Sequence, residues 1–159
     1  MTTYYFDSSG IVKYYISERG SRWVSDVIDA QTKEGKWKHH IAIAQIGIVE
    51  VAAAIAKRRR MGQISKRKQE KTLGLFSKHH RERYTVLRAG DNTIELATDL
   101  TQRHPLRAYD AIQLATALLL NRSLLADGLP PLTFVSADDI LCEAARAEGL
   151  PAENPNQHE

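Results

Sequence analysis

The feature that most constrains the fold is the stretch from Leu106 to Leu120, which reads LRAYDAIQLATALLL. A helix that is apolar nearly all round is expected to be buried. One carboxylate, Asp110, interrupts this stretch near its start. Burial of an ionised carboxylate is costly unless another group compensates its charge, and no Lys or Arg follows on the same face before Arg122. Asp110 is therefore either an acid at a helix start or one of several carboxylates around a cation.

Segments typical of strands alternate with helical segments along the chain. Short apolar runs bounded by polar residues are expected to be strands at residues 3–6, 41–44, 84–87 and 132–135, with an edge strand at 150–154. One or two helices separate each pair of strands. This order predicts an α/β fold of three layers, in which helices cover both faces of a mostly parallel central sheet of four to five strands.

Particular residues mark the ends of several helices. Ser21, Ser65 and Asn92 precede helical segments and are the expected N-caps. Gly149 is expected to end the last helix. The segment from residue 123 to 131 contains two prolines and is expected to be a loop.

Length and charge are those of one ordinary globular domain. The 159 residues suffice for a single buried core. We expect residues 1–155 to form one domain and residues 156–159 to be a frayed C-terminal tail. The formal net charge is only +3, but Lys and Arg concentrate between Lys57 and Arg83.

Cysteine usage and hydropathy bear on the compartment. Cys142 is the one cysteine of the chain, which excludes an intrachain disulfide and indicates a reducing compartment. No apolar run reaches the length that spans a membrane. Residues 1–7 lack the basic region and apolar core of a signal peptide. These observations predict a cytoplasmic protein that does not contact a membrane.

Four acids occupy equivalent places in the predicted fold. Asp7 directly follows the first strand, and Asp138 follows the fourth strand closely. Glu50 and Asp110 lie in the early turns of helices. Ligand sites in open parallel sheets form beyond the carboxyl ends of the strands, where helices begin. We therefore expect the four carboxylates to meet at one edge of the sheet.

Each of these acids also has a simpler interpretation. Asp7 and Asp138 are suitable N-caps, and Asp139 could share the second cap. Glu50 and Asp110 could be ordinary acids near helix starts, where negative charge is favourable. The joint pattern, rather than any one acid, favours a common site.

A carboxylate cluster of this kind predicts a bound cation. Two carboxylates ~4 Å apart repel each other by about 4 kcal/mol at an effective dielectric constant near ~20. Ligation by oxygen alone suits Mg²⁺ or Mn²⁺ and not zinc, which prefers His and Cys. The predicted metal ligands are Asp7, Glu50, Asp110 and Asp138.

Two further groups of residues are candidates for contacts with substrate. Ser8 and Ser136 neighbour the acids and could orient a water or a phosphate, or could simply cap helices. The basic run is either a solvated helix face or a surface that contacts a nucleic-acid phosphate backbone. The candidates for such backbone contacts are Arg58, Arg59, Arg60, Lys66 and Arg67.

Several enzyme classes lack their signatures here. The sequence contains no GxxxxGK[ST] or GxGxxG phosphate-binding loop and no GxSxG nucleophile elbow. A phospho-receiver domain would have paired acids after the first strand, and a haloacid-dehalogenase-like phosphatase would begin with Asp-x-Asp. In this chain Asp7 is followed by Ser8 and Ser9.

Four motifs carry a resemblance to a known family. They are YFDSS at 5–9, IVEV at 48–51, LRAYDAIQLA at 106–115 and FVSAD at 134–138. With these motifs the chain resembles the PIN-domain ribonucleases, and among them the VapC-type toxins of bacterial toxin–antitoxin pairs. The resemblance implies a PIN-like fold and a metal-dependent endoribonuclease whose acidic residues fall on Asp7, Glu50, Asp110 and Asp138. It also implies a small antitoxin protein as partner and a homodimer.

The resulting hypothesis is hydrolysis of RNA phosphodiester bonds by a water that Mg²⁺ or Mn²⁺ activates. Asp7, Glu50, Asp110 and Asp138 are the expected catalytic and metal-binding residues, and Asp7 or Asp110 would orient or deprotonate the water. The alternatives are a PIN-fold nuclease that acts on DNA or in RNA processing, and a catalytically silent module that binds nucleic acid or an antitoxin.

Overall fold

The computed structural model describes residues 1–158. Within them the strands form one five-stranded sheet in the order β3-β2-β1-β4-β5, and every pair of neighbours is parallel. The strands are β1 (Thr2–Phe6), β2 (His39–Ala44), β3 (Thr85–Leu87), β4 (Thr133–Val135) and β5 (Ala152–Glu153). The helices are α1 (Ser8–Tyr15), α2 (Ser21–Ile28), α3 (Gln45–Arg60), α4 (Lys66–Glu82), α5 (Asp91–Arg103), α6 (Ala108–Ala126), α7 (Asp139–Ala147) and the short 3₁₀ helix η1 (Pro155–Gln157).

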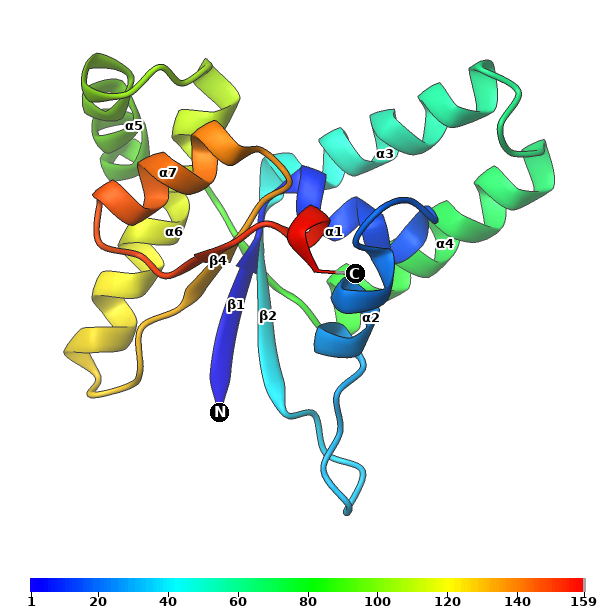
Figure 1. Ribbon diagram of the computed structural model, residues 1–159, viewed down its shortest axis with the longest axis horizontal. Helices are drawn as coiled ribbons and strands as arrows, with labels where there is room; N and C mark the ends of the chain where they lie inside the picture. The colour runs from blue at the N-terminus through cyan, green and yellow to red at the C-terminus, as the bar shows by residue number, and fades with distance from the viewer. Residues whose placement is uncertain (159) are drawn as a thin grey trace.

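The predicted α/β fold with a parallel sheet and helices on both faces is confirmed. Alternate residues of a strand point to opposite faces, so Tyr5 of β1 packs into one core and Phe6 into the other. Helices α5, α6 and α7 cover the Tyr5 face, and helices α1 to α4 cover the Phe6 face (Figure 1). The apolar helix α6 is buried in its middle, around Leu114 and Ala115, whereas both of its ends are exposed.

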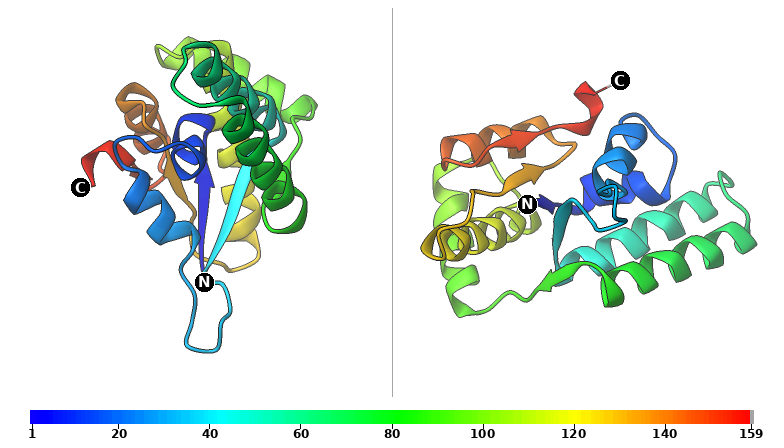
Figure 2. Two further views of the ribbon diagram at one scale, coloured as in Figure 1. Left: turned by 90° about the vertical axis from the view of Figure 1, so that its right-hand side faces the viewer. Right: turned by 90° about the horizontal axis from the view of Figure 1, so that it is seen from below.

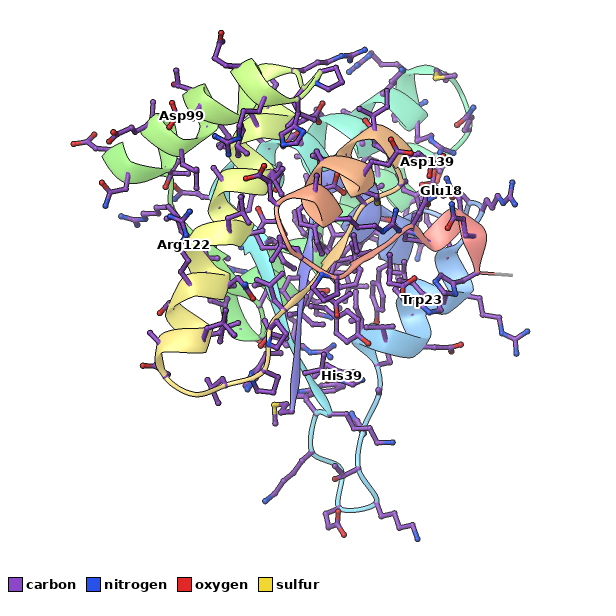
Figure 3. All side chains as sticks on the ribbon, turned by 60° about the vertical axis from the view of Figure 1, so that its left-hand side comes forward. Glu18, Trp23, His39, Asp99, Arg122 and Asp139 are labelled. Carbon is purple, nitrogen blue, oxygen red and sulfur yellow. The ribbon has the colours of Figure 1, made fainter. Side chains whose placement is uncertain are left out.

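The strand order determines where a ligand site can form. The chain moves from β1 to β2 and β3 on one side, and β4 and β5 lie on the other side. The connectivity therefore reverses between β1 and β4, at the place where parallel sheets bind ligands beyond their carboxyl ends. Figure 3 places Asp139, which follows β4, at this end of the molecule, whereas His39, the first residue of β2, lies at the opposite end.

Helices α3 and α4 form a paired arm. They lie side by side and extend away from the sheet in both Figure 1 and Figure 2. Val51, Ile55 and Phe76 anchor the base of the arm in the core. Its tip is the connection from Arg60 to Lys66, where the predicted basic residues gather.

Most predicted strand and helix positions agree with the structure, but two caps were placed wrongly. Ser65 caps α4 by accepting the Lys68 N–H. The N-cap of α2 is Gly20 and not Ser21, whose hydroxyl instead accepts the Glu18 N–H and donates to the Ile16 carbonyl oxygen. The N-cap of α5 is Gly90 and not Asn92. Helix α6 also continues three residues beyond Ser123, into the expected loop.

The C-terminal segment differs from the expected frayed tail. Asn156 and Gln157 belong to the 3₁₀ helix η1, the ring of His158 stacks on Trp23, and the His158 Nε2 lies 2.7 Å from a Glu153 oxygen. Gly20 lets the segment approach α2, because a Cβ there would lie 2.6 Å from the Pro155 carbonyl carbon and oxygen. Stacking and close backbone approach thus order this segment, and Glu159 lies outside the described residues.

Two expectations about burial can also be compared with the structure. The Cys142 side chain is fully buried, and its thiol points to the Ser136 carbonyl oxygen at 3.3 Å. Among residues 1–158, none of the helices combines the length and the apolar character needed to cross a membrane.

Candidate active site

Asp7 lies where β1 ends and α1 begins, and only 4% of it is exposed. Its Oδ1 accepts hydrogen bonds from the Gly10 N–H at 2.9 Å and from the Ser9 hydroxyl at 2.7 Å. Its Oδ2 accepts the Ser136 hydroxyl at 2.6 Å. Asp7 therefore is the N-cap of α1, as the simpler interpretation holds, but the two serine hydroxyls also fix its carboxylate in one orientation.

The close approach of α1 to β4 makes this arrangement possible. A Cβ on Gly10 would lie 3.0 Å from the Val135 carbonyl oxygen and 3.2 Å from Cδ1 of Phe6. These distances are shorter than ordinary van der Waals contacts, so only glycine fits here without a shift. The absence of a side chain brings Asp7 within reach of Ser136, which lies 129 residues later in the chain.

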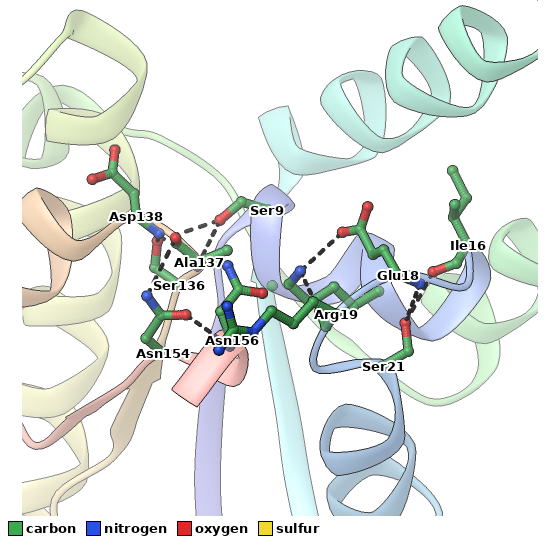
Figure 4. Close-up of polar contacts among 12 residues, drawn as sticks. Ser9, Ile16, Glu18, Arg19, Ser21, Ser136, Ala137, Asp138, Asn154 and Asn156 are labelled. Carbon is green, nitrogen blue, oxygen red and sulfur yellow. Dashed lines mark hydrogen bonds and ion pairs between the residues drawn. The ribbon is translucent and has the colours of Figure 1, made fainter. Parts of the chain in front are cut away.

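Asp138 is the N-cap of α7, and its side chain is exposed. Its Oδ1 accepts the N–H groups of Ile140 and Leu141 at 2.9 and 3.3 Å. Its own N–H donates to the Ser136 hydroxyl oxygen at 3.1 Å (Figure 4). Ser136 thus joins Asp138 to Asp7, and the second oxygen of Asp138 is not used in the cap.

Asp139 is turned to a different part of the structure. Its Oδ1 accepts Asn154 Nδ2 at 2.7 Å and Gln157 Nε2 at 3.4 Å. The side chain therefore holds the C-terminal segment, which agrees with the preference for Asp138 over Asp139 as a site residue.

Glu50 lies in the second turn of α3 and is half-buried. Its Oε2 accepts the Ser8 hydroxyl at 3.0 Å, and its Oε1 accepts Gln113 Nε2 at 3.0 Å. Ser8, a candidate for orienting a water or a phosphate or for capping a helix, thus donates to the carboxylate of Glu50.

Asp110, in the first turn of α6, is the electrostatic centre of the group. Burial raises its pKa, and the negative charges of Asp138 and Glu50 raise the pKa further. Burial likewise raises the pKa of Asp7 to about 6, against the hydrogen bonds that lower it and with a further contribution from Asp110. Electrostatic interactions therefore link Asp110 to Asp138, to Glu50 and to Asp7.

The donor set restricts which metal the group can hold. Within residues 1–158 no three His, Cys, Asp or Glu side chains are arranged to bind one metal ion directly. The available donors at this edge are carboxylate and hydroxyl oxygens. Mg²⁺ keeps several of its waters and is commonly bound through one or two carboxylates. The residues fit a hydrated Mg²⁺ or Mn²⁺ ion, and they do not fit zinc.

The predicted basic contacts divide into two kinds. Arg58 pairs with Glu18, at 2.6 Å between the guanidinium and a carboxylate oxygen, and Glu18 also pairs with the buried Lys13 at 3.1 Å. Arg58 therefore ties the arm to the loop after α1. The remaining predicted residues of the basic tip are exposed, namely Arg59, Arg60, Lys66 and Arg67.

Sequence reasoning missed three residues of this site: Tyr5, Ser9 and Gln113. Ser9 holds Asp7, and its hydroxyl also accepts the Ala137 N–H at 2.9 Å (Figure 4). Gln113 is polar within an otherwise apolar helix, three residues after Asp110 and thus on the same face. This position in the sequence could have identified Gln113 as a candidate site residue.

Three solved structures are similar to this chain. A toxin–antitoxin complex from Klebsiella pneumoniae matches with a TM-score of 0.57 and 18% identity, over 96% of this chain and 97% of that chain. FitAcB from Neisseria gonorrhoeae matches with a TM-score of 0.58 and 15% identity, over 98% and 99%. PAE2754 from Pyrobaculum aerophilum matches with a TM-score of 0.55 and 18% identity, over 95% and 83%. At these identities the similarity shows a common fold.

Sequence comparison gives the family. No curated protein matches the chain. The PIN domain family matches residues 4–147, a range that runs from β1 through α7 and includes all four acids. The chain therefore belongs to the PIN domain family.

Proposed function

We propose that this chain is a metal-dependent endoribonuclease that hydrolyses RNA phosphodiester bonds and acts as the toxin of a toxin–antitoxin pair. The observation that carries the proposal is the position of Asp110, whose pKa is raised by burial and further by the charges of Asp138 and Glu50. A buried carboxylate whose pKa is raised at the switch point of a parallel sheet is costly for the fold, and such groups are typical of functional sites. Membership of the PIN domain family supports a nuclease.

The four acids share metal binding in the proposed mechanism, and Asp110 has a second role as proton acceptor. Asp7, Glu50, Asp110 and Asp138 would hold Mg²⁺ or Mn²⁺, directly or through water. The bound ion lowers the pKa of water and stabilises negative charge on the phosphoryl group. Asp110 is only half-buried, so its carboxylate can contact a water, and its raised pKa makes it a better proton acceptor. Ser9 and Ser136 keep the Asp7 carboxylate from rotating.

The exposed basic tip gives this mechanism a means to bind RNA. Glu50 and Arg60 lie on the same helix, about 15 Å apart along its axis at ~1.5 Å per residue. A nucleic acid bound at the carboxylates could therefore place a nearby phosphate at the tip. Such contacts give affinity without sequence preference. Arg59, Arg60, Lys66 and Arg67 are the proposed contacts, and Arg58 contributes through its pairing with Glu18.

A cleavage assay tests the nuclease. The purified protein should cleave structured or unstructured RNA with Mg²⁺ or Mn²⁺ and lose this activity in EDTA. Asp7→Asn and Asp110→Asn should abolish cleavage, whereas Asp139→Asn, which changes an adjacent acid turned to the C-terminal segment, should retain it. Equal activity of Asp7→Asn and the unaltered protein would refute the proposed site. Cleavage of matched DNA alone would favour the DNA nuclease, and metal binding without cleavage would favour the silent module.

The toxin role rests on different support. The Klebsiella pneumoniae structure with this fold is a toxin–antitoxin complex. We propose that the chain acts in the cytoplasm, forms a homodimer and binds a small antitoxin protein. Expression of the unaltered chain alone should arrest bacterial growth, and expression of Asp7→Asn should not. Growth arrest by both proteins would separate toxicity from the proposed site, and light scattering would measure the oligomeric state.

A further inference from the structure

A buried chain of hydrogen bonds ends on one of the proposed metal-binding acids. The Tyr5 hydroxyl donates to Gln113 Oε1 at 2.6 Å, and Gln113 Nε2 donates to Glu50 Oε1 at 3.0 Å. Tyr5 is fully buried and Gln113 is 2% exposed. The chain therefore runs from the central strand β1, through the buried helix α6, to the arm helix α3.

The order of donors and acceptors in this series of hydrogen bonds leaves the Gln113 amide one favourable orientation. An ionised carboxylate only accepts hydrogen bonds, so the NH₂ group of Gln113 must face Glu50. The amide oxygen then faces the Tyr5 hydroxyl, which donates to it. Rotation of the amide by half a turn would place its oxygen against the carboxylate and its NH₂ group against the hydroxyl hydrogen of Tyr5, so both hydrogen bonds would be lost.

Glu50 is held on both of its oxygens. Ser8 donates to Oε2 at 3.0 Å and Gln113 donates to Oε1 at 3.0 Å. Both donors are neutral, so they fix the direction of the carboxylate without neutralising its charge. A Lys or Arg in the place of Gln113 would instead pair with Glu50 and reduce its attraction for a cation.

We propose that Gln113, held by Tyr5, is a positioning residue that orients Glu50 for the cation. This inference rests on the proposed function. Outer hydrogen-bond partners of metal ligands fix the orientation of those ligands, and their loss typically lowers metal affinity or activity by about 10–100-fold. Helix α6 then contributes twice to the site, with Asp110 at its edge and Gln113 one turn further along the same face.

Mn²⁺ binding tests the proposal without any cleavage. Titration calorimetry would compare the unaltered protein with Gln113→Met, which keeps the size of the side chain and removes both hydrogen bonds. We expect the dissociation constant for Mn²⁺ to be roughly tenfold higher in Gln113→Met than in the unaltered protein. The matched control is Asn121→Leu, which removes an amide of the same helix whose oxygen accepts the Leu132 N–H. It should change Mn²⁺ affinity by less than about twofold, because it does not contact Glu50.

A double-mutant cycle separates positioning from packing. Tyr5→Phe removes one hydroxyl, leaves the Gln113 N–H donor in place and should weaken Mn²⁺ binding by about threefold, less than Gln113→Met does. The double variant should bind Mn²⁺ no more weakly than Gln113→Met alone, because Tyr5 acts only through Gln113. In RNA cleavage, Gln113→Met should lower kcat and leave KM unchanged, since the basic tip and not Gln113 contacts RNA.

The outcomes distinguish this proposal from the one on which it rests. If the unaltered protein binds no Mn²⁺ and cleaves no RNA, the proposed function is wrong and the positioning role falls with it. If the unaltered protein binds Mn²⁺ and a folded Gln113→Met binds it equally well, only the positioning role is wrong. If Gln113→Met does not fold, Tyr5→Phe decides, and unchanged Mn²⁺ affinity in that variant overturns the proposal.

Discussion

The carboxylate of Asp7 should make the metal-free protein less stable at neutral pH than at acidic pH. Burial raises the pKa of Asp7 from 3.8 to about 6 in the folded protein. A proton therefore binds more tightly to the folded state than to the unfolded state. The contribution of Asp7 to stability is fully present below pH 3.8 and is lost as the pH rises through 6. At about 1.4 kcal/mol per pH unit, the loss approaches 3 kcal/mol.

The substitution Asp7→Asn removes this titration and keeps most of the local hydrogen bonds. The amide oxygen can still accept hydrogen bonds from the Ser9 hydroxyl and the Gly10 N–H, whereas Ser136 must accept a hydrogen bond where it now donates one. The rearrangement at Ser136 adds an offset that does not depend on pH. The stability difference between the variant and the unaltered protein should therefore move by about 3 kcal/mol in favour of Asn between pH 3 and pH 8.

Urea unfolding in EDTA, followed by circular dichroism at several pH values, measures this change. For a chain of this size, 3 kcal/mol corresponds to roughly 6–12 °C in Tm. Asp26→Asn, on an exposed surface of α2, controls for the loss of a charge and should stay within about 0.5 kcal/mol at every pH. A difference for Asp7→Asn that does not change with pH would refute the reasoning.

Added Mg²⁺ provides a second arm of the same experiment. At pH 7.5, Mg²⁺ at ten times its dissociation constant should stabilise the unaltered protein by about 1.4 kcal/mol. It should stabilise Asp7→Asn much less. The variant is thus expected to be more stable and inactive, which is a common relation between stability and function.

Three further predictions follow from other contacts. Gly20→Ala should lower the free energy of unfolding in urea by more than about 2 kcal/mol, because φ is 84° and a Cβ would lie 2.6 Å from Pro155. The control Gly35→Ala has φ 77° and open space around it, and it should lower the free energy of unfolding by only about 1 kcal/mol. Burial raises the pKa of the Cys142 thiol to about 11. At pH 8 a thiol reagent should therefore react with the folded protein over ~100-fold more slowly than with the protein unfolded in denaturant, and the reaction should be limited by the rate of unfolding. Equally fast reaction of the folded and unfolded protein would contradict the burial. Arg59→Ala should lower the salt dependence of RNA binding by about one unit of slope and leave stability unchanged, whereas Arg58→Ala should also lower stability, because Arg58 pairs with Glu18.

The sequence by itself determined the layers of the fold and the positions of the acids along the chain. Alternation at Tyr5 and Phe6 assigns their side chains to opposite faces of the sheet, because the period of a strand is two. The continuous apolar character of α6 requires burial. Asp7 and Asp138 follow parallel strands, so the geometry of the sheet brings them to one end.

Only the tertiary structure decided how the side chains of the site pair. Ser8 donates to Glu50, Ser136 joins Asp7 to Asp138, and Gln113 links β1 to the arm. These partners lie 42 to 129 residues apart where they come from different elements. Their pairing depends on close approaches such as that of α1 to β4 at Gly10, which the local sequence pattern does not encode.

The same distinction holds for the caps and for Asp110. A polar residue before a helix is a local signal, but Ser21 bonds within the preceding turn, and Gly20 takes the cap position where Pro155 packs against it. Asp110 is recognisable in sequence as an acid in an apolar helix. Its raised pKa arises first from burial and then from the charges of Asp138 and Glu50, and both causes depend on distances that only the folded chain establishes.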